Sequence, residues 1–232
     1  MPVIDRIILE LKNSFGWKTK RKLVVLSFDD YGNVRVDSKE ARQRLNDSGL
    51  KVSTRFDAFD SLENREDIEV LYEALSSVKD IHGRHAILTP FSVPCNIDFE
   101  EMASTNYSHY IYELLPKTYQ KLSSKNPTRY EGAWDLWKKG IAEGLVVPQF
   151  HGREHLNLTL FEQKLVRKDP DILIVLKNRC YTSITNTVIP TIKYTAAFDF
   201  FELNENERFE SVIEDGVKKF EIVFLPCLQN LC

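Results

Sequence analysis

Long hydrophobic runs are absent from this chain of 232 residues. No stretch approaches the roughly 18 uninterrupted apolar residues that a membrane-spanning helix requires, so we expect no membrane span. The first 17 residues alternate apolar with charged side chains and contain neither the apolar segment nor the small-residue cleavage site of a secretion signal. This pattern predicts an amphipathic N-terminal helix and a cytoplasmic protein.

Cysteine is scarce, and neither sign of charge dominates. The four cysteines lack the CxxC spacing of a zinc finger and do not indicate a disulfide framework. A formal net charge of -3 gives no reason to expect nucleic acid or an anionic membrane as a partner. Internal repeats and low-complexity tracts are also missing, so we expect one domain over residues 1–232.

Apolar, β-branched segments alternate with segments of helical periodicity along the chain. Buried strands are predicted at residues 22–28, 51–56, 85–90 and 145–150. Helices are predicted at residues 38–50, 61–77, 131–143, 156–166 and 209–220. Less regular segments predict strands at 108–115, 194–201 and 221–227, and loops at 94–98 and 123–129. This alternation indicates a mainly parallel sheet with crossover helices, in which reactive side chains gather at the carboxyl ends of strands.

Two of the five histidines, His151 and His155, are four residues apart. If they open a helix, both imidazoles lie on one face and can reach the same metal ion. A hydrolytic zinc site needs a third protein ligand and an open position for water. The carboxylates of Asp29 and Asp30, which follow the first predicted strand, are the candidates for that ligand. The alternatives are a coincidental histidine pair on a helix surface and an acidic pair that caps a turn.

Further polar residues lie at predicted strand exits or next to the histidines. As candidate substrate-binding residues we take Arg55, Asp57, Asn96, Asp98, Arg153 and Glu154. A solvated ion pair is the alternative for Arg153 and Glu154. A zinc protease motif of the type His-Glu-x-x-His is excluded, because Gly152 follows His151.

Three motifs follow one another along the chain: Asp29-Asp30-Tyr31-Gly32, Asn96-Ile97-Asp98-Phe99 and the segment from Pro148 to Asn157. Taken in order, they resemble the polysaccharide deacetylases of the NodB-homology type, and in particular a bacterial polysaccharide (de)acetylase branch. The resemblance spans roughly residues 23–201. It implies a distorted seven-stranded (β/α) barrel, metal ligation by Asp30, His151 and His155, and Asp29 as the general base.

The chain departs from that family in two respects. Gly152 stands where the family has a hydroxyl residue, and the family's later Arg-x-x-x-x-Pro motif, acyl-pocket strand and histidine acid have no match. We therefore expect a barrel that lacks its last strands. The resemblance implies a hydrolase that uses Zn²⁺ or another divalent cation to remove N- or O-linked acetyl groups from a saccharide in bacterial surface-polysaccharide metabolism. The alternative is a truncated, non-catalytic barrel that binds a metal or a glycan.

Overall fold

The computed structural model describes residues 4, 8, 11, 12, 14–16, 18–20, 22–50, 52, 61–181, 194–200 and 202–228. The predicted strand at 51–56 and most of the predicted N-terminal helix lie outside these residues. Among the described residues, no helix is both long enough and apolar enough to cross a membrane.

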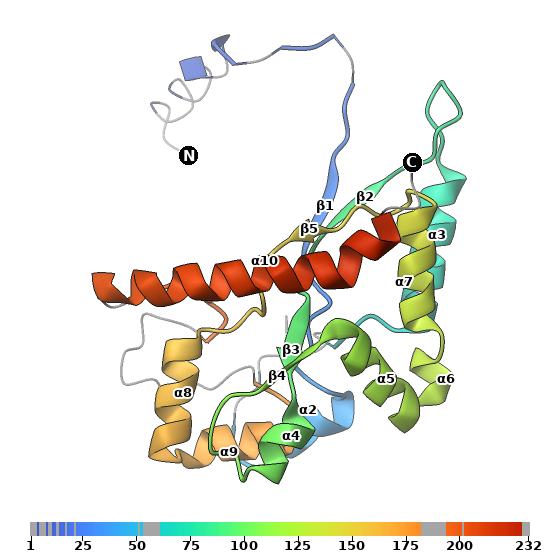
Figure 1. Cartoon of the computed structure of the whole chain (residues 1–232). Coiled ribbons are helices and arrows are strands. Elements are labelled where there is room, and N and C mark those ends of the chain that lie inside the picture. Colours follow the sequence, from blue (N-terminus) through green and yellow to red (C-terminus); the bar gives the residue numbers. More distant parts are fainter. Residues whose placement is uncertain are drawn as a thin grey trace.

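A parallel sheet of three strands forms the centre of the fold, in the order β1-β2-β5. Its strands are β1 (Leu26–Tyr31), β2 (Leu88–Ser92) and β5 (Gln149–Phe150). All three lie at or next to predicted strands, so the prediction of a parallel α/β sheet is confirmed. Across the described residues the sheet is open and no barrel closes (Figure 1).

A second sheet pairs β3 (Cys95–Ile97) with β4 (Tyr112–Leu114) in antiparallel register. The strand predicted at 108–115 is therefore confirmed over its last part, whereas the loop predicted at 94–98 is wrong where β3 forms. All three β3 residues are buried. Strand β3 places Asn96 in the protein interior, next to the loop that follows β1.

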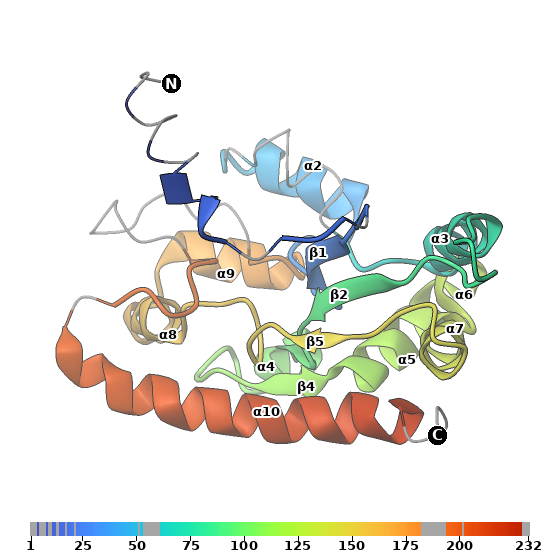
Figure 2. The same cartoon turned by 90° about the horizontal axis from the view of Figure 1, so that it is seen from above.

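The helices cover the sheet on both sides. Figure 2 shows α2 and α10 on opposite sides of the sheet, with α8 and α9 at one end and α3, α6 and α7 at the other. The helices are α2 (Lys39–Asp47), α3 (Arg65–Ser77), α4 (Phe99–Ser104), α5 (Leu115–Lys125), α6 (Pro127–Tyr130), α7 (Ala133–Ala142), α8 (Leu158–Arg167), α9 (Pro170–Lys177) and α10 (Asn206–Leu228), with a short 3-10 turn η1 (Leu203–Glu205).

Side-chain caps explain why the predicted helices begin near the expected positions. Ser38 caps α2 by accepting a hydrogen bond from the Ala41 amide. Asn64 and Asp67 form a reciprocal capping box at the start of α3. The helices predicted at 131–143 and 156–166 correspond to α7 and α8.

Three further sequence predictions are wrong in the described part of the chain. The loop expected at 123–129 is the end of α5 followed by α6, and the strand expected at 194–201 consists of turns over its described residues 194–200. The strand expected at 221–227 is the continuation of α10, which runs unbroken to Leu228. Phe220 and Phe224, one helical turn apart, pack with ring centroids 4.7 Å apart, and Phe224 also contacts Trp137 at 5.8 Å. A continuous apolar run fits a buried helix as well as a strand, and here packing selects the helix.

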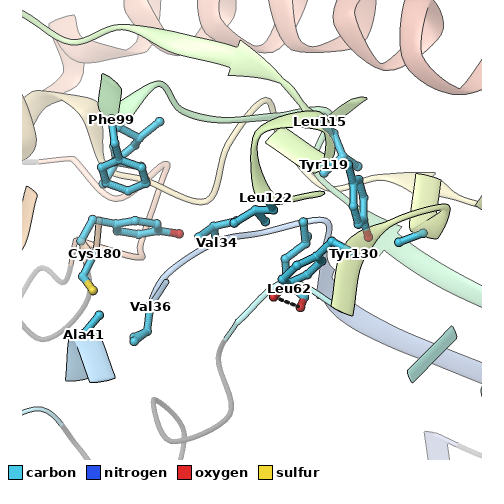
Figure 3. Close-up of a cluster of buried hydrophobic side chains, with 14 of the residues drawn as sticks. Val34, Val36, Ala41, Leu62, Phe99, Leu115, Tyr119, Leu122, Tyr130 and Cys180 are labelled. Atoms are coloured by element: carbon cyan, nitrogen blue, oxygen red, sulfur yellow. Dashed lines mark hydrogen bonds between the residues drawn. The ribbon is translucent and has the colours of Figure 1, made fainter. Parts of the chain in front are cut away.

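The segment that follows β1 is anchored in the hydrophobic core. Val34 and Val36 are each only 3% exposed. In Figure 3 the Val34 side chain lies near Leu122 and that of Val36 near Ala41. Burial of a valine side chain contributes about 1.5–3 kcal/mol relative to full exposure. The two valines therefore fix the path of the chain directly after the Asp29-Asp30 pair.

Candidate metal centre

An irregularity in β1 sets the direction of the Asp30 side chain. Phe28 pairs with Pro90 and Tyr31 with Ser92, so two residues of β1 lie opposite the single residue Phe91. Asp30 has a φ of 67°, in the left-handed region that aspartate enters more readily than most residues. A bulge of this kind bends the strand and redirects a side chain. It allows Asp30 to face the histidine loop at the carboxyl end of the sheet.

Gly32 completes the turn after the bulge. Its φ is 80°, and an added Cβ would lie 2.9 Å from both the Leu115 side chain and the Val93 carbonyl oxygen. Only glycine combines this backbone conformation with so close an approach. The glycine of the Asp-Asp-Tyr-Gly motif is therefore required by the fold, and it lets the chain turn into the core at Val34.

The two histidines lie in an irregular segment after β5, so the condition that they open a helix is not met. The His151 amide donates to the Ser92 carbonyl at 3.1 Å, which ties this segment to the end of β2. Gly152 has a φ of 96°, a conformation that favours glycine over residues with a side chain. Helix α8 begins only at Leu158, with Asn157 as its N-cap.

The imidazoles nevertheless converge, with ring centroids 5.4 Å apart. The Asp30 Oδ1 atom lies 3.3 Å from His151 Nε2 and 3.1 Å from His155 Nε2. Two donors bound to one zinc ion at 2.0–2.1 Å in tetrahedral geometry lie about 3.3 Å apart. The two separations from Asp30 Oδ1 therefore match those of a four-coordinate site, and one ligand atom from each of the three residues lies within 4.8 Å of the others.

The Asp30 Oδ1 atom gives independent support for a cation. It is buried and accepts no hydrogen bond from the described residues, although two ring nitrogens are close to it. A buried carboxylate oxygen without a partner carries a large desolvation penalty. At the same time the Asp30, His151 and His155 side chains are 31%, 28% and 23% exposed, so solvent reaches the group. A cation at this position would satisfy Oδ1 and remain open to water.

Arg35, which the sequence analysis missed, is part of the same group. Its guanidinium donates to Asp30 Oδ2 at 2.5 Å and lies 3.5 Å from His155 Nδ1. Burial lowers the pKa of His155. The nearby Asp30 carboxylate opposes this decrease, whereas Arg35 and His151 lower the pKa further. A lowered pKa favours the neutral imidazole, which is the form that binds metals. The five-residue separation from Asp30 carries no recognisable signal in the sequence.

Asp29 is not part of the group formed by Asp30, His151 and His155. It is exposed, and its side chain forms no hydrogen bond or ion pair with the described part of the chain. Its role as a base stays a prediction. The candidate substrate-binding residues Arg55 and Asp57 lie outside the described residues.

Asn96 and Asp98 are both buried, at 2% exposure each. Asn96 Oδ1 accepts from the Val34 amide and Nδ2 donates to the Gly32 carbonyl, each at 2.8 Å, so this side chain braces the loop after Asp30. Asp98 caps α4 and pairs with Lys117 at 2.7 Å and Lys121 at 2.5 Å. Burial raises the pKa of Asp98, but the two lysines outweigh burial and hold it well below the usual range. Substrate binding by either residue stays a prediction.

Arg153 and Glu154 are buried, which excludes the solvated pair. Arg153 donates to Glu154 at 2.6 and 2.9 Å and to Asp215 of α10 at 2.9 Å, and its guanidinium lies 4.3 Å from the centre of the Tyr112 ring. Burial raises the pKa of Glu154, and the hydrogen bonds from Arg153 oppose that rise. The pair connects the histidine segment to α10 and β4, and substrate contact stays a prediction.

Comparison of the chain with protein-family models, with curated proteins and with solved structures found no match. The case for a function therefore depends on the geometry of the Asp30, His151 and His155 group, which is the group of three His, Cys, Asp or Glu residues that could hold a metal ion in the described part of the chain.

Proposed function

We propose that this protein is a metal-dependent hydrolase that removes acetyl groups, N- or O-linked, from a carbohydrate. Zn²⁺ or another divalent cation would be held by Asp30, His151 and His155. The observation that carries the proposal is the buried Oδ1 atom of Asp30, which accepts no hydrogen bond from the described residues and has an imidazole nitrogen at 3.1 Å and another at 3.3 Å. The resemblance of three motifs to polysaccharide deacetylases supplies the class of substrate.

A divalent cation held by these three residues would lower the pKa of a bound water to about 7 and would polarise a carbonyl group. We assign Asp29, which is exposed and next in sequence to Asp30, the role of accepting a proton from the attacking water. The water oxygen adds to the acetyl carbonyl carbon, and the C–N or C–O bond to the sugar then breaks. Acetate and the free amine or hydroxyl are the products, and the leaving nitrogen or oxygen takes up a proton.

The seven-stranded barrel implied by the resemblance stays a prediction. The parallel order β1-β2-β5, with helices in the connections, is compatible with part of such a barrel. A non-catalytic domain that binds a metal or a glycan is the alternative function, since the family's late histidine acid has no match in the sequence.

The test begins with elemental analysis of the purified protein and of three variants. We expect the parent to contain stoichiometric divalent metal, His151→Ala to lose it, and Asp29→Asn to retain it. His109→Ala is the matched control, because His109 is exposed and contacts its neighbour Ser108. Hydrolysis of acetylated saccharides and acetyl esters is then measured with the metal-loaded proteins.

Three outcomes would contradict parts of the proposal. Metal retained by His151→Ala would remove that histidine from the ligand set. Turnover by Asp29→Asn at the parent rate would refute the base assignment. Stoichiometric metal in the parent with no turnover of any acetylated substrate would favour the non-catalytic alternative.

A further inference from the structure

The two carboxylate oxygens of Asp30 have different environments. Oδ2 accepts a hydrogen bond from Arg35 at 2.5 Å, whereas Oδ1 faces the two imidazoles and accepts no hydrogen bond from the described residues. An arginine guanidinium is always charged and always a donor, so Oδ2 is the oxygen that accepts in this pair. One oxygen is thus occupied by the protein and the other is left for a cation.

The backbone around Arg35 is fixed before any cation binds. The Arg35 carbonyl accepts from the Tyr181 amide at 3.1 Å, and the preceding Val34 amide donates to Asn96 at 2.8 Å. The Tyr181 hydroxyl also contacts the His155 carbonyl oxygen at 3.3 Å. The Arg35 side chain itself is only 14% exposed. The loop that carries Arg35 is therefore tied to the histidine segment through Tyr181.

Arg35 contacts both Asp30 and His155, and the contact with Asp30 is the one that can position a ligand. The contact with His155 Nδ1, at 3.5 Å, is longer, and it forms only while that nitrogen carries no proton, because guanidinium cannot accept. The contact with Asp30 Oδ2 is shorter, at 2.5 Å. Hydrogen bonds to ligating carboxylates orient them and tune the metal site.

We infer that Arg35 is a positioning residue that restricts Asp30 to ligation through Oδ1 alone, and that it thereby selects small four-coordinate cations such as Zn²⁺ and Co²⁺ over Mn²⁺ and Ca²⁺. This inference rests on the metal site of the proposed function and does not require catalysis. Larger ions with more ligands commonly take both oxygens of a carboxylate, whereas zinc sites are mostly four-coordinate. Because Oδ2 accepts a hydrogen bond from Arg35, it does not coordinate a cation together with Oδ1.

The charge of Arg35 does not obscure the test, because it repels every divalent cation to a similar extent. The ratio of the Zn²⁺ and Mn²⁺ affinities therefore isolates the effect on coordination. In Arg35→Met, both oxygens of Asp30 become available, and we expect the preference for Zn²⁺ over Mn²⁺ to fall about tenfold, the lower end of the effect of removing a group that orients a ligand. Arg35→Lys keeps a charged donor and is expected to preserve most of the preference.

The experiment titrates Zn²⁺ and Mn²⁺ into the parent and both variants by calorimetry and records visible spectra of the Co²⁺-loaded proteins. Four-coordinate Co²⁺ absorbs visible light more strongly than six-coordinate Co²⁺, so we expect the absorption to weaken in Arg35→Met. Arg35→Gln serves as a second neutral variant if Arg35→Met does not fold. An unchanged affinity ratio together with an unchanged Co²⁺ spectrum in the neutral variant would overturn the inference and leave the metal site intact. A parent that binds none of these ions would refute the metal site of the proposed function and this inference with it.

Discussion

Replacement of Asn96 by alanine is expected to destabilise the fold through the loop that follows Asp30. The Asn96 side chain is 2% exposed, and both of its polar atoms are in use. Its Oδ1 accepts from the Val34 amide at 2.8 Å, and its Nδ2 donates to the Gly32 carbonyl at 2.8 Å. Alanine removes both hydrogen bonds and leaves two backbone groups in the interior without their partner.

The magnitude follows from the cost of unsatisfied buried groups. Each buried donor or acceptor left without a partner costs about 1–3 kcal/mol, and two of them lead us to expect a loss of about 2–6 kcal/mol. This is a large part of the roughly 5–15 kcal/mol that stabilises a typical domain. Asn96→Asp retains an acceptor for the Val34 amide but cannot donate to the Gly32 carbonyl when ionised, so its loss should also be substantial.

The assay is equilibrium unfolding in urea, followed by circular dichroism, with the same m-value expected for parent and variant. Asn126→Ala is the control, because Asn126 is exposed and its side chain makes no capping hydrogen bond. We expect that control to stay within about 0.5 kcal/mol of the parent. A loss below about 1 kcal/mol in Asn96→Ala at unchanged m would refute the view that this side chain braces the loop.

Two further predictions concern the histidine segment and the Asp98 ion pairs. Gly152→Ala places a side chain at a φ of 96°, where its nearest neighbour is 3.6 Å away, so backbone strain of about 1–2 kcal/mol is expected without a clash. Calorimetry should show weaker metal binding, and parent-like affinity would contradict the need for glycine. Asp98→Asn should destabilise the protein at neutral pH. The pKa of Asp98 is lowered in the folded state, so the ionised carboxylate stabilises the fold above about pH 4, and this stabilisation is lost as the pH falls further. Urea unfolding from pH 7 to 3 tests this, and a difference between parent and Asp98→Asn that grows toward acid pH would contradict it.

Strand polarity made the approach of Asp30 to the histidines predictable from the sequence. A run of apolar residues before Asp29 and another before His151 predict two strands, and helical patterns between them predict that the strands run in parallel. Carboxyl ends of parallel strands meet at one edge of a sheet, so the residues that follow them meet as well. The pairings of β2 with β1 and with β5 confirm this part of the prediction.

The errors fall where local pattern leaves two structures open. Residues 221–227 form an apolar run, which suits a strand or a buried helix equally well. Packing against α7 favours the helix over the strand. The Phe224 ring centroid lies 6.1 Å from that of Trp134 and 5.8 Å from that of Trp137. Such contacts between residues distant in the chain cannot be read from either segment alone. The strand predicted at 194–201 is wrong for the same reason, because the local pattern of residues does not specify a partner strand.

The convergence of the two imidazoles has a different cause from the one that the sequence indicated. Their four-residue spacing would bring them together on a helix, yet both lie before α8 begins at Leu158. They meet because the His151 amide is held by Ser92 and because Gly152 adopts a φ of 96°. Spacing alone therefore does not establish a ligand pair in this chain. Arg35 is a residue of the site that no spacing predicts. It contacts Asp30 because the bulge in β1 turns that carboxylate, and a bulge of one residue has no signature in the hydrophobic pattern.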